Sequence, residues 1–128
     1  MYKKYTLEVT EQNSGASRTI EMDGGNTLDD LSNAILNAVN FDKSHLYMFS
    51  LSQKPYGEGY YHPMADLDDG DKSAADASLN SLGLRTRKKL LYVYDFGDDW
   101  RFDVTVKKVE TVDAPCKTAV IASQGELT

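Results

Sequence analysis

The sequence contains one cysteine and no long run of apolar residues. Because Cys116 is the only thiol among 128 residues, no disulfide can form within the chain, which excludes a secreted scaffold held together by disulfides. The uninterrupted apolar stretches span only a few residues, whereas crossing a bilayer takes roughly 20. The first residues alternate between polar and apolar side chains, unlike the apolar segment of a signal peptide. We therefore expect a cytoplasmic protein that does not enter a membrane.

The sequence also contains fewer positively charged residues than negatively charged ones. Fourteen Lys and Arg face twenty Asp and Glu, which gives a net charge of −6 and a pI near 4.8. This balance opposes attraction to the phosphates of nucleic acids and to anionic lipids. The one basic cluster comprises Arg85, Arg87, Lys88 and Lys89, and no aromatic residues interleave with it as stacking surfaces for bases. We interpret it as the solvated flank of a strand, so nucleic acid is not an expected partner.

In other respects the composition is that of an ordinary globular domain. Hydrophobic residues make up 41% and charged residues 27% of the chain, and its length suits one domain over residues 1–128. Eight tyrosines supply amphipathic surface of the kind found in protein contacts. We therefore expect a protein partner and no cofactor, while the oligomeric state is not specified.

Apolar periodicity in the first half predicts a β-hairpin followed by a helix. Polar and apolar residues alternate over residues 5–9, and a second strand follows over residues 18–22 after a turn-rich segment. Thr27 and Asp30 have the spacing of a capping box, and apolar residues recur behind them at helical intervals. Asn40 predicts a left-handed end to this helix.

The second half predicts further strands. Residues 45–51 and 90–94 have the composition of buried strands, and residues 102–106 alternate between apolar and polar side chains. Residues 77–83 predict one or two helical turns, and residues 118–122 a last short strand. This order of elements predicts an α+β fold with a mainly antiparallel sheet, one principal helix packed on a face, a ββαβ start and a later hairpin.

A long connection separates the two halves. Residues 53–77 are rich in Gly, Asp and Ser and predict a mobile segment that carries one short strand. Tyr60, Tyr61 and His62 form an aromatic group within it and are candidate binding residues. The carboxylates of residues 66–76 lack the Gly and Glu that a calcium loop places at its sixth and twelfth positions, so we interpret this part as a solvated loop.

A short acidic turn joins the strands predicted at 90–94 and 102–106. Asp95, Asp98 and Asp99 bring three carboxylates together within five residues, a set that can coordinate a hard cation such as Mg²⁺ or Ca²⁺. The alternative is structural, because Asp side chains commonly accept backbone N–H groups in tight turns and Phe96 and Trp100 would pack beneath this one. We favour the structural interpretation.

Histidine and cysteine give little support to a zinc site or a Cys–His catalytic pair. His45, His62 and Cys116 are the only residues of these types, and they lie in three distant segments without the paired spacing of zinc ligands. We expect an ordinary hydrogen-bonded role for His45. No metal site is predicted apart from the carboxylates of the turn.

The turn belongs to a recognisable motif, Tyr92-Val93-Tyr94-Asp95-Phe96-Gly97-Asp98-Asp99-Trp100. This run resembles the signature of the plasmid pRiA4b ORF-3-like family, Tyr-x-Tyr-Asp-Phe-Gly-Asp-x-Trp. In the tight loop between the strands, Gly97 is free to take a positive φ. Residues 27–31 and 42–49 are similar to the family's helix opening and following strand, so the resemblance covers about residues 2–110. The site residues that it implies are Tyr92, Tyr94, Asp95, Phe96, Gly97, Asp98 and Trp100.

The chain departs from the family pattern at three places. Relatives usually carry His two residues after the signature Trp, where this chain has Phe102. Many have Trp-Arg near the second strand, where this chain has Ser17-Arg18-Thr19, and the usual acidic C-terminal motif with paired glycines is missing. The resemblance implies no established reaction.

Two functional hypotheses follow. The first is a non-enzymatic binding module linked to mobile elements, in which residues 60–62 and 95–100 present aromatic and acidic surface to a protein. The second is a metal-assisted hydrolase or nuclease-like enzyme in which Asp95, Asp98 and Asp99 hold the cation and either histidine acts as the base. Carboxylates that point into a common pocket would favour the enzyme, and carboxylates that point onto the turn backbone would favour the module.

Overall fold

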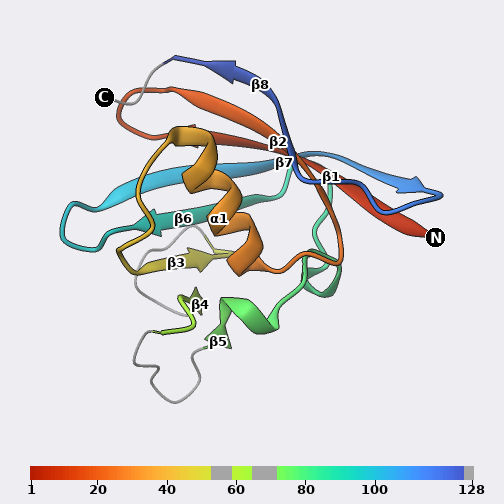
Figure 1. Cartoon of the computed structure of the whole chain (residues 1–128), viewed down its shortest axis with the longest axis horizontal. Coiled ribbons are helices and arrows are strands. Elements are labelled where there is room, and N and C mark those ends of the chain that lie inside the picture. The colour runs from red at the N-terminus through yellow and green to blue at the C-terminus, as the bar shows by residue number, and fades with distance from the viewer. Residues whose placement is uncertain (53–58, 65–71, 126–128) are drawn as a thin grey trace.

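The chain folds into one large sheet with a helix on one face (Figure 1). The computed structural model describes residues 1–52, 59–64 and 72–125. The strands are β1 (Tyr2–Glu11), β2 (Ser17–Asp23), β3 (Tyr47–Ser50), β4 (Tyr60–Tyr61), β5 (Lys72–Ser73), β6 (Lys89–Tyr94), β7 (Trp100–Val112) and β8 (Ala119–Gln124). The helices are α1 (Leu28–Val39) and two short 3-10 helices, η1 (Ala74–Asp76) and η2 (Leu79–Leu82).

The sheet order is β5-β4-β3-β6-β7-β1-β2-β8. All neighbouring strands run antiparallel except β4 and β5, which are parallel. This arrangement confirms the predicted α+β fold, with its mainly antiparallel sheet, its ββαβ start and its later hairpin. The strand predicted at 118–122 is present as β8, which pairs with β2 at one edge of the sheet.

The hairpin of β1 and β2 is closed by a buried carboxylate. Glu11, at the end of β1, is 1% exposed and accepts the backbone N–H groups of Asn13 (2.8 Å) and Ser14 (2.9 Å). Burial raises the pKa of Glu11, but these donors outweigh it and hold the pKa below the ordinary value of a glutamate. The ionised carboxylate therefore stabilises the turn.

Helix α1 begins and ends at the predicted residues. The Thr27 side chain accepts the N–H of Asp30, and the Asp30 side chain accepts the N–H of Thr27, which completes the capping box. Asn40 ends the helix in the left-handed conformation, with φ 59°. The apolar stripe of the helix, which includes Leu31 and Ile35, is fully buried against the sheet.

Strand β6 is buried on both faces. Leu90, Tyr92 and Tyr94 belong to the main core between the sheet and α1, whereas Leu91 and Val93 join a smaller apolar cluster on the opposite face. This explains why residues 90–94 are apolar or aromatic throughout instead of alternating. The signature motif thus begins inside the protein and runs outward to the turn.

The long connection carries more regular structure than predicted. Its described part contains β4, β5 and η1, where we predicted one short strand, because Tyr60 and Tyr61 extend the sheet beside β3 and Lys72 and Ser73 pair with them in turn. Residues 53–58 and 65–71, which include most of the acidic segment interpreted as a solvated loop, lie outside the described residues. No helix in the described ranges has both the length and the apolar character needed to span a membrane.

Candidate functional site

The signature motif helps to form a cleft of about 300 Å³, called here the signature pocket. The cleft lies between the connection from α1 to β3 and the turn from β6 to β7. Its lining residues are Asn40, Phe41, Asp42, His45, Tyr94, Asp95, Asp98 and Trp100. Of the site residues expected from the sequence, the fold therefore brings together His45, Tyr94, Asp95, Asp98 and Trp100.

Aromatic rings form the base of the signature pocket. Phe41 packs edge-on against Trp100, with ring centroids 4.9 Å apart, and lies 6.4 Å from the ring of Tyr94. Tyr94 is 2% exposed and Trp100 is half-buried against the core. Since each ring is held by core packing, the base of the pocket is preformed.

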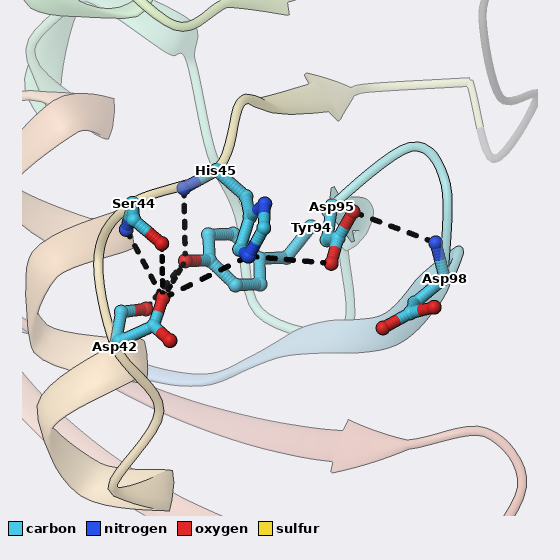
Figure 2. Close-up of polar contacts among 6 residues, drawn as sticks. All are labelled: Asp42, Ser44, His45, Tyr94, Asp95 and Asp98. Carbon is cyan, nitrogen blue, oxygen red and sulfur yellow. Dashed lines mark hydrogen bonds and ion pairs between the residues drawn. The ribbon is translucent and has the colours of Figure 1, made fainter.

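Hydrogen bonds fix the wall on the side of the α1–β3 connection (Figure 2). The Tyr94 hydroxyl donates to the backbone carbonyl of Asp42 and accepts the backbone N–H of His45 at 3.3 Å. Asp42 Oδ1 accepts the hydroxyl of Ser44 at 2.7 Å and its backbone N–H at 3.1 Å. These bonds from Ser44, with a smaller contribution from nearby His45, lower the pKa of Asp42, whereas burial raises the pKa of Tyr94. At neutral pH the wall presents an ionised carboxylate beside a neutral phenol.

His45 lies between two carboxylates. Its Nε2 atom is 3.6 Å from Asp95 Oδ2 and 3.9 Å from Asp42 Oδ1, and its ring meets that of Tyr94 edge-on at 5.8 Å (Figure 2). With Asp98 the pocket has three carboxylates, and neither Lys nor Arg lines it. The electrostatic potential in the pocket is therefore negative and favours a cationic ligand.

The acidic turn is held by its own backbone. Asp95 N–H donates to the carbonyl of Leu46 (2.9 Å), Asp99 N–H donates to the carbonyl of Asp95 (2.6 Å), and Asp98 N–H reaches Asp95 Oδ1 at 3.4 Å. Gly97 does not use its freedom to take a positive φ. Asp95 (φ 59°) and Asp99 (φ 57°) adopt it instead, because the chain reverses at the two ends of the turn and aspartate tolerates this conformation better than most residues.

The three carboxylates of the turn point in different directions. Asp99 Oδ2 pairs with Arg101, 3.0 Å from both Nε and Nη2, while Asp95 faces His45 and Asp98 faces the pocket. Among the described residues, no three or more His, Cys, Asp or Glu side chains are grouped to hold a metal ion. The candidate cation ligands Asp95, Asp98 and Asp99 are thus not brought together as a set.

The other expected site residues lie elsewhere. Phe96 and Tyr61 pack on the small apolar cluster of the opposite sheet face. Tyr60 packs against the main core with Lys72 Nζ 5.4 Å from its ring centroid, and His62 meets the ring of Tyr47 at 5.0 Å and accepts the N–H of Met64. None of the aromatic group at 60–62 lines the signature pocket.

Tyr92, the first residue of the motif, lies beneath the pocket. It is fully buried, and its hydroxyl shares a 2.6 Å hydrogen bond with Ser32 of α1. This bond ties the helix to β6. Gly97 is exposed at the tip of the turn, outside the pocket lining.

Sequence reasoning missed the contribution of Phe41 and Asp42. Both follow directly after the helix end at Asn40, and their side chains enter the pocket because the left-handed Asn40 turns the chain back toward β6. The signal that could have identified Asp42 is the Asp-x-Ser pattern of Asp42 and Ser44, which is typical of a fixed turn.

Phe102 and Arg18, at two of the places where the sequence departs from the family pattern, make structural contacts. Phe102, where relatives usually have His, is 1% exposed and contacts the rings of Phe41 (6.3 Å) and Tyr92 (5.8 Å), so it extends the apolar base of the pocket. Arg18 donates from Nε to the Ala38 carbonyl at 3.2 Å and from Nη1 to the Gln124 carbonyl at 3.1 Å. Arg18 therefore joins the end of α1 to β8.

Comparisons with known proteins agree with the motif. A family model described as plasmid pRiA4b ORF-3-like protein matches residues 3–127, nearly the whole chain, which confirms the resemblance and extends it past residue 110. A crystal structure of a protein of unknown function from Methanosarcina mazei Go1 is similar, with a TM-score of 0.70 and 27% identity, and the match covers 94% of this chain and 70% of that one. No curated protein sequence matches the chain.

Proposed function

The chain belongs to the plasmid pRiA4b ORF-3-like family, and on this premise we propose that it is a non-enzymatic binding module that takes a basic side chain of a partner protein into the signature pocket. One observation carries the proposal. The pocket combines the carboxylates of Asp42, Asp95 and Asp98 with three aromatic rings, and no Lys or Arg neutralises them within the lining.

The chemistry of the pocket suits a guanidinium or ammonium group. A planar guanidinium can stack on the rings of Trp100 and Phe41 while its N–H groups donate to carboxylate oxygen. Hydrogen bonds between such charged partners are stronger than neutral ones. The cleft of about 300 Å³ is at the small end of ligand cavities, which fits one long side chain.

Trp100 gives a direct measurement, because it is the only tryptophan and lies in the pocket. Its fluorescence should change saturably on titration with N-acetyl-arginine amide or N-acetyl-lysine amide, and not with the neutral citrulline analogue. Asp98→Asn should weaken the binding about tenfold, which corresponds to about 1.4 kcal/mol.

The matched control is Asp113→Asn, which removes the same charge at an exposed position outside the pocket. It should bind like the wild type. Equal binding of the citrulline analogue, or equal losses in the two variants, would show that the pocket does not select a cation.

The metal-assisted hydrolase or nuclease-like enzyme is the second candidate. It is favoured by His45, whose Nε2 lies in the pocket 3.6 Å from Asp95, a position suited to a general base. Calorimetric titration with Mg²⁺, Mn²⁺, Ca²⁺ and Zn²⁺ tests it. Tight cation binding that disappears in Asp98→Asn/Asp99→Asn would support this enzyme. Heats of injection no larger than the heat of dilution would show that the protein does not bind the cation that the enzyme requires.

We also propose a cytoplasmic location, a link to mobile elements and a single-domain organisation for the protein. The family description refers to a plasmid, which supports a link to mobile elements, and a single cysteine suits the reducing cytoplasm. Residues 1–128 are proposed to act as one domain. Cell fractionation tests the location, and two separate unfolding transitions would contradict a single domain.

A further inference from the structure

A second cavity, of about 320 Å³, lies at the opposite end of β6 from the signature pocket, beside the middle of β7. We call it the basic cavity. It is lined by the cationic side chains of Arg87, Lys89 and Lys107, by the hydroxyl residues Thr86 and Thr105, and by Val106. No carboxylate belongs to the lining, although the chain as a whole carries a net charge of −6.

The three cations are not neutralised by the part of the protein that the structure describes. The ion pairs within the described residues involve Lys4, His45, Arg101 and Lys108, and none includes a cation of the basic cavity. Lys89 and Thr105 project from the sheet face opposite α1, because their neighbours Leu90 and Val104 point into the main core, and Lys107 follows at a β-bulge where the pairing of β1 with β7 shifts by one residue. Positive charge is thus concentrated on one small area of that face.

The backbone holds Arg87 in place. Its N–H donates to the Val106 carbonyl at 2.7 Å, and the Val106 N–H donates to the Lys88 carbonyl at 2.8 Å, so the turn before β6 is fixed to β7. Arg87 has a φ of 79°, a conformation that is unfavourable for a residue with a side chain. The two hydrogen bonds maintain it, so the backbone that carries Arg87 is fixed against β7.

We propose that the basic cavity binds a phosphate dianion carried as a monoester on a small organic group. An arginine fork matches the geometry of phosphate oxygens, the lysines add charge, and threonine hydroxyls can donate to the remaining oxygen atoms. The cavity is larger than one phosphate ion needs, which leaves room for the esterified group beside the aliphatic stems of the lysines. The acidic remainder of the surface opposes a long polyanion such as nucleic acid.

The experiment is an NMR titration of the full chain with O-phosphoserine and, separately, inorganic phosphate, at an ionic strength held constant with sodium chloride. O-phosphoserine should shift the backbone amides of residues 86–89 and 105–107 saturably and bind several-fold more tightly than inorganic phosphate. Since a phosphate monoester loses its second proton with a pKa of about 6, affinity should rise between pH 5 and pH 7.

Adjacent lysines of β7 supply the matched variants. Lys107→Gln should weaken the binding about tenfold, whereas Lys108→Gln removes the same charge one residue further on, where Lys108 pairs with Glu110 outside the cavity, and should leave the affinity unchanged. Similar losses of affinity in both variants, or the same chemical-shift changes with sodium chloride alone, would show that the anion responds only to the general positive charge of this surface. Either result would contradict a specific phosphate site. If inorganic phosphate bound as tightly as O-phosphoserine, the proposal that the cavity recognises a phosphate monoester would be contradicted.

Discussion

Asp95 connects the signature motif to the pocket through both its backbone and its side chain. It adopts a φ of 59°, while its carboxylate faces His45 and accepts the N–H of Asp98. Asp95→Ala should lower the free energy of unfolding by about 1–3 kcal/mol, because it combines left-handed strain with the loss of an acceptor. Asp95→Gly should lose less, since glycine adopts this φ without strain. Urea unfolding followed by Trp100 fluorescence measures both.

The comparison with glycine separates the two roles. If Asp95→Gly were as destabilising as Asp95→Ala, the side-chain contacts would dominate and the backbone conformation would matter little. Stability unchanged in both variants would mean that Asp95 does not anchor the turn.

The buried pair of Tyr92 and Ser32 provides a second test. Their hydroxyls meet at 2.6 Å in the core, where an unpaired hydroxyl has no water to replace its partner. Tyr92→Phe should therefore lower the free energy of unfolding by about 1–3 kcal/mol. The double variant Tyr92→Phe/Ser32→Ala should lower the free energy of unfolding by less than the sum of the two single changes, because it leaves no unpaired hydroxyl.

A double-mutant cycle measured by chemical unfolding gives the coupling between the two residues. The same cycle between Tyr92→Phe and Asn33→Ala is the control, since Asn33 lies on the exposed side of α1. Additive effects for Tyr92 and Ser32 would contradict a stabilising bond between helix and strand.

The hairpin of β1 and β2 predicts a dependence of stability on pH. Because the folded pKa of Glu11 is below its unfolded value, ionised Glu11 stabilises the hairpin fully at pH values above the unfolded pKa of about 4.3. This contribution is lost as the pH falls through the lower folded pKa. Glu11→Gln should lower the free energy of unfolding by about 1–2 kcal/mol at pH 7, since one backbone N–H would face an amide NH₂ group.

The stability difference between the wild type and Glu11→Gln should shrink as the pH falls below 4.3, which denaturant unfolding from pH 7 to pH 3 can follow. Glu8→Gln is the control, because Glu8 lies on the same strand and makes no contact with the turn. A difference that is constant over this range would mean that the Glu11 carboxylate does not titrate with folding.

At the scale of elements, β6 and β7 carry both proposed sites. Tyr94 pairs with Trp100 at the signature pocket, and Lys89 pairs with Thr105 at the basic cavity. The six residues from Lys89 to Tyr94 span about 17 Å along the strand. One pair of strands therefore holds an acidic pocket and a basic cavity at a fixed separation.

For the molecule as a whole, local patterns were sufficient to predict the elements. The capping box at Thr27, the left-handed Asn40 and the alternation along β1 and β7 are all decided by neighbouring residues, so the sequence carries their signals directly. The motif likewise predicted four of the residues that line the signature pocket, Tyr94, Asp95, Asp98 and Trp100.

The remaining features depend on contacts between distant segments. Nothing near Phe41 indicates that it meets Trp100, because this contact follows from the docking of α1 on the sheet. The alternation of strand faces sends Phe96 away from the pocket, although it stands within the same motif as Trp100. The positive φ values lie at Asp95 and Asp99, at the two ends of the turn, and not at Gly97. Here too a contact with a distant segment is involved, because the Asp95 N–H donates to the Leu46 carbonyl where the chain begins to reverse.

The central position of β1 has a consequence for protein synthesis. Although β1 precedes every other element in the chain, it lies between β2 and β7, and its partners on β7 are residues 102–112. A growing chain can form the β1–β2 hairpin early, but one edge of β1 stays open until about a hundred further residues have been translated. On the ribosome this edge, with its apolar Leu7 and Val9, is the surface that a chaperone would need to shield until β7 emerges.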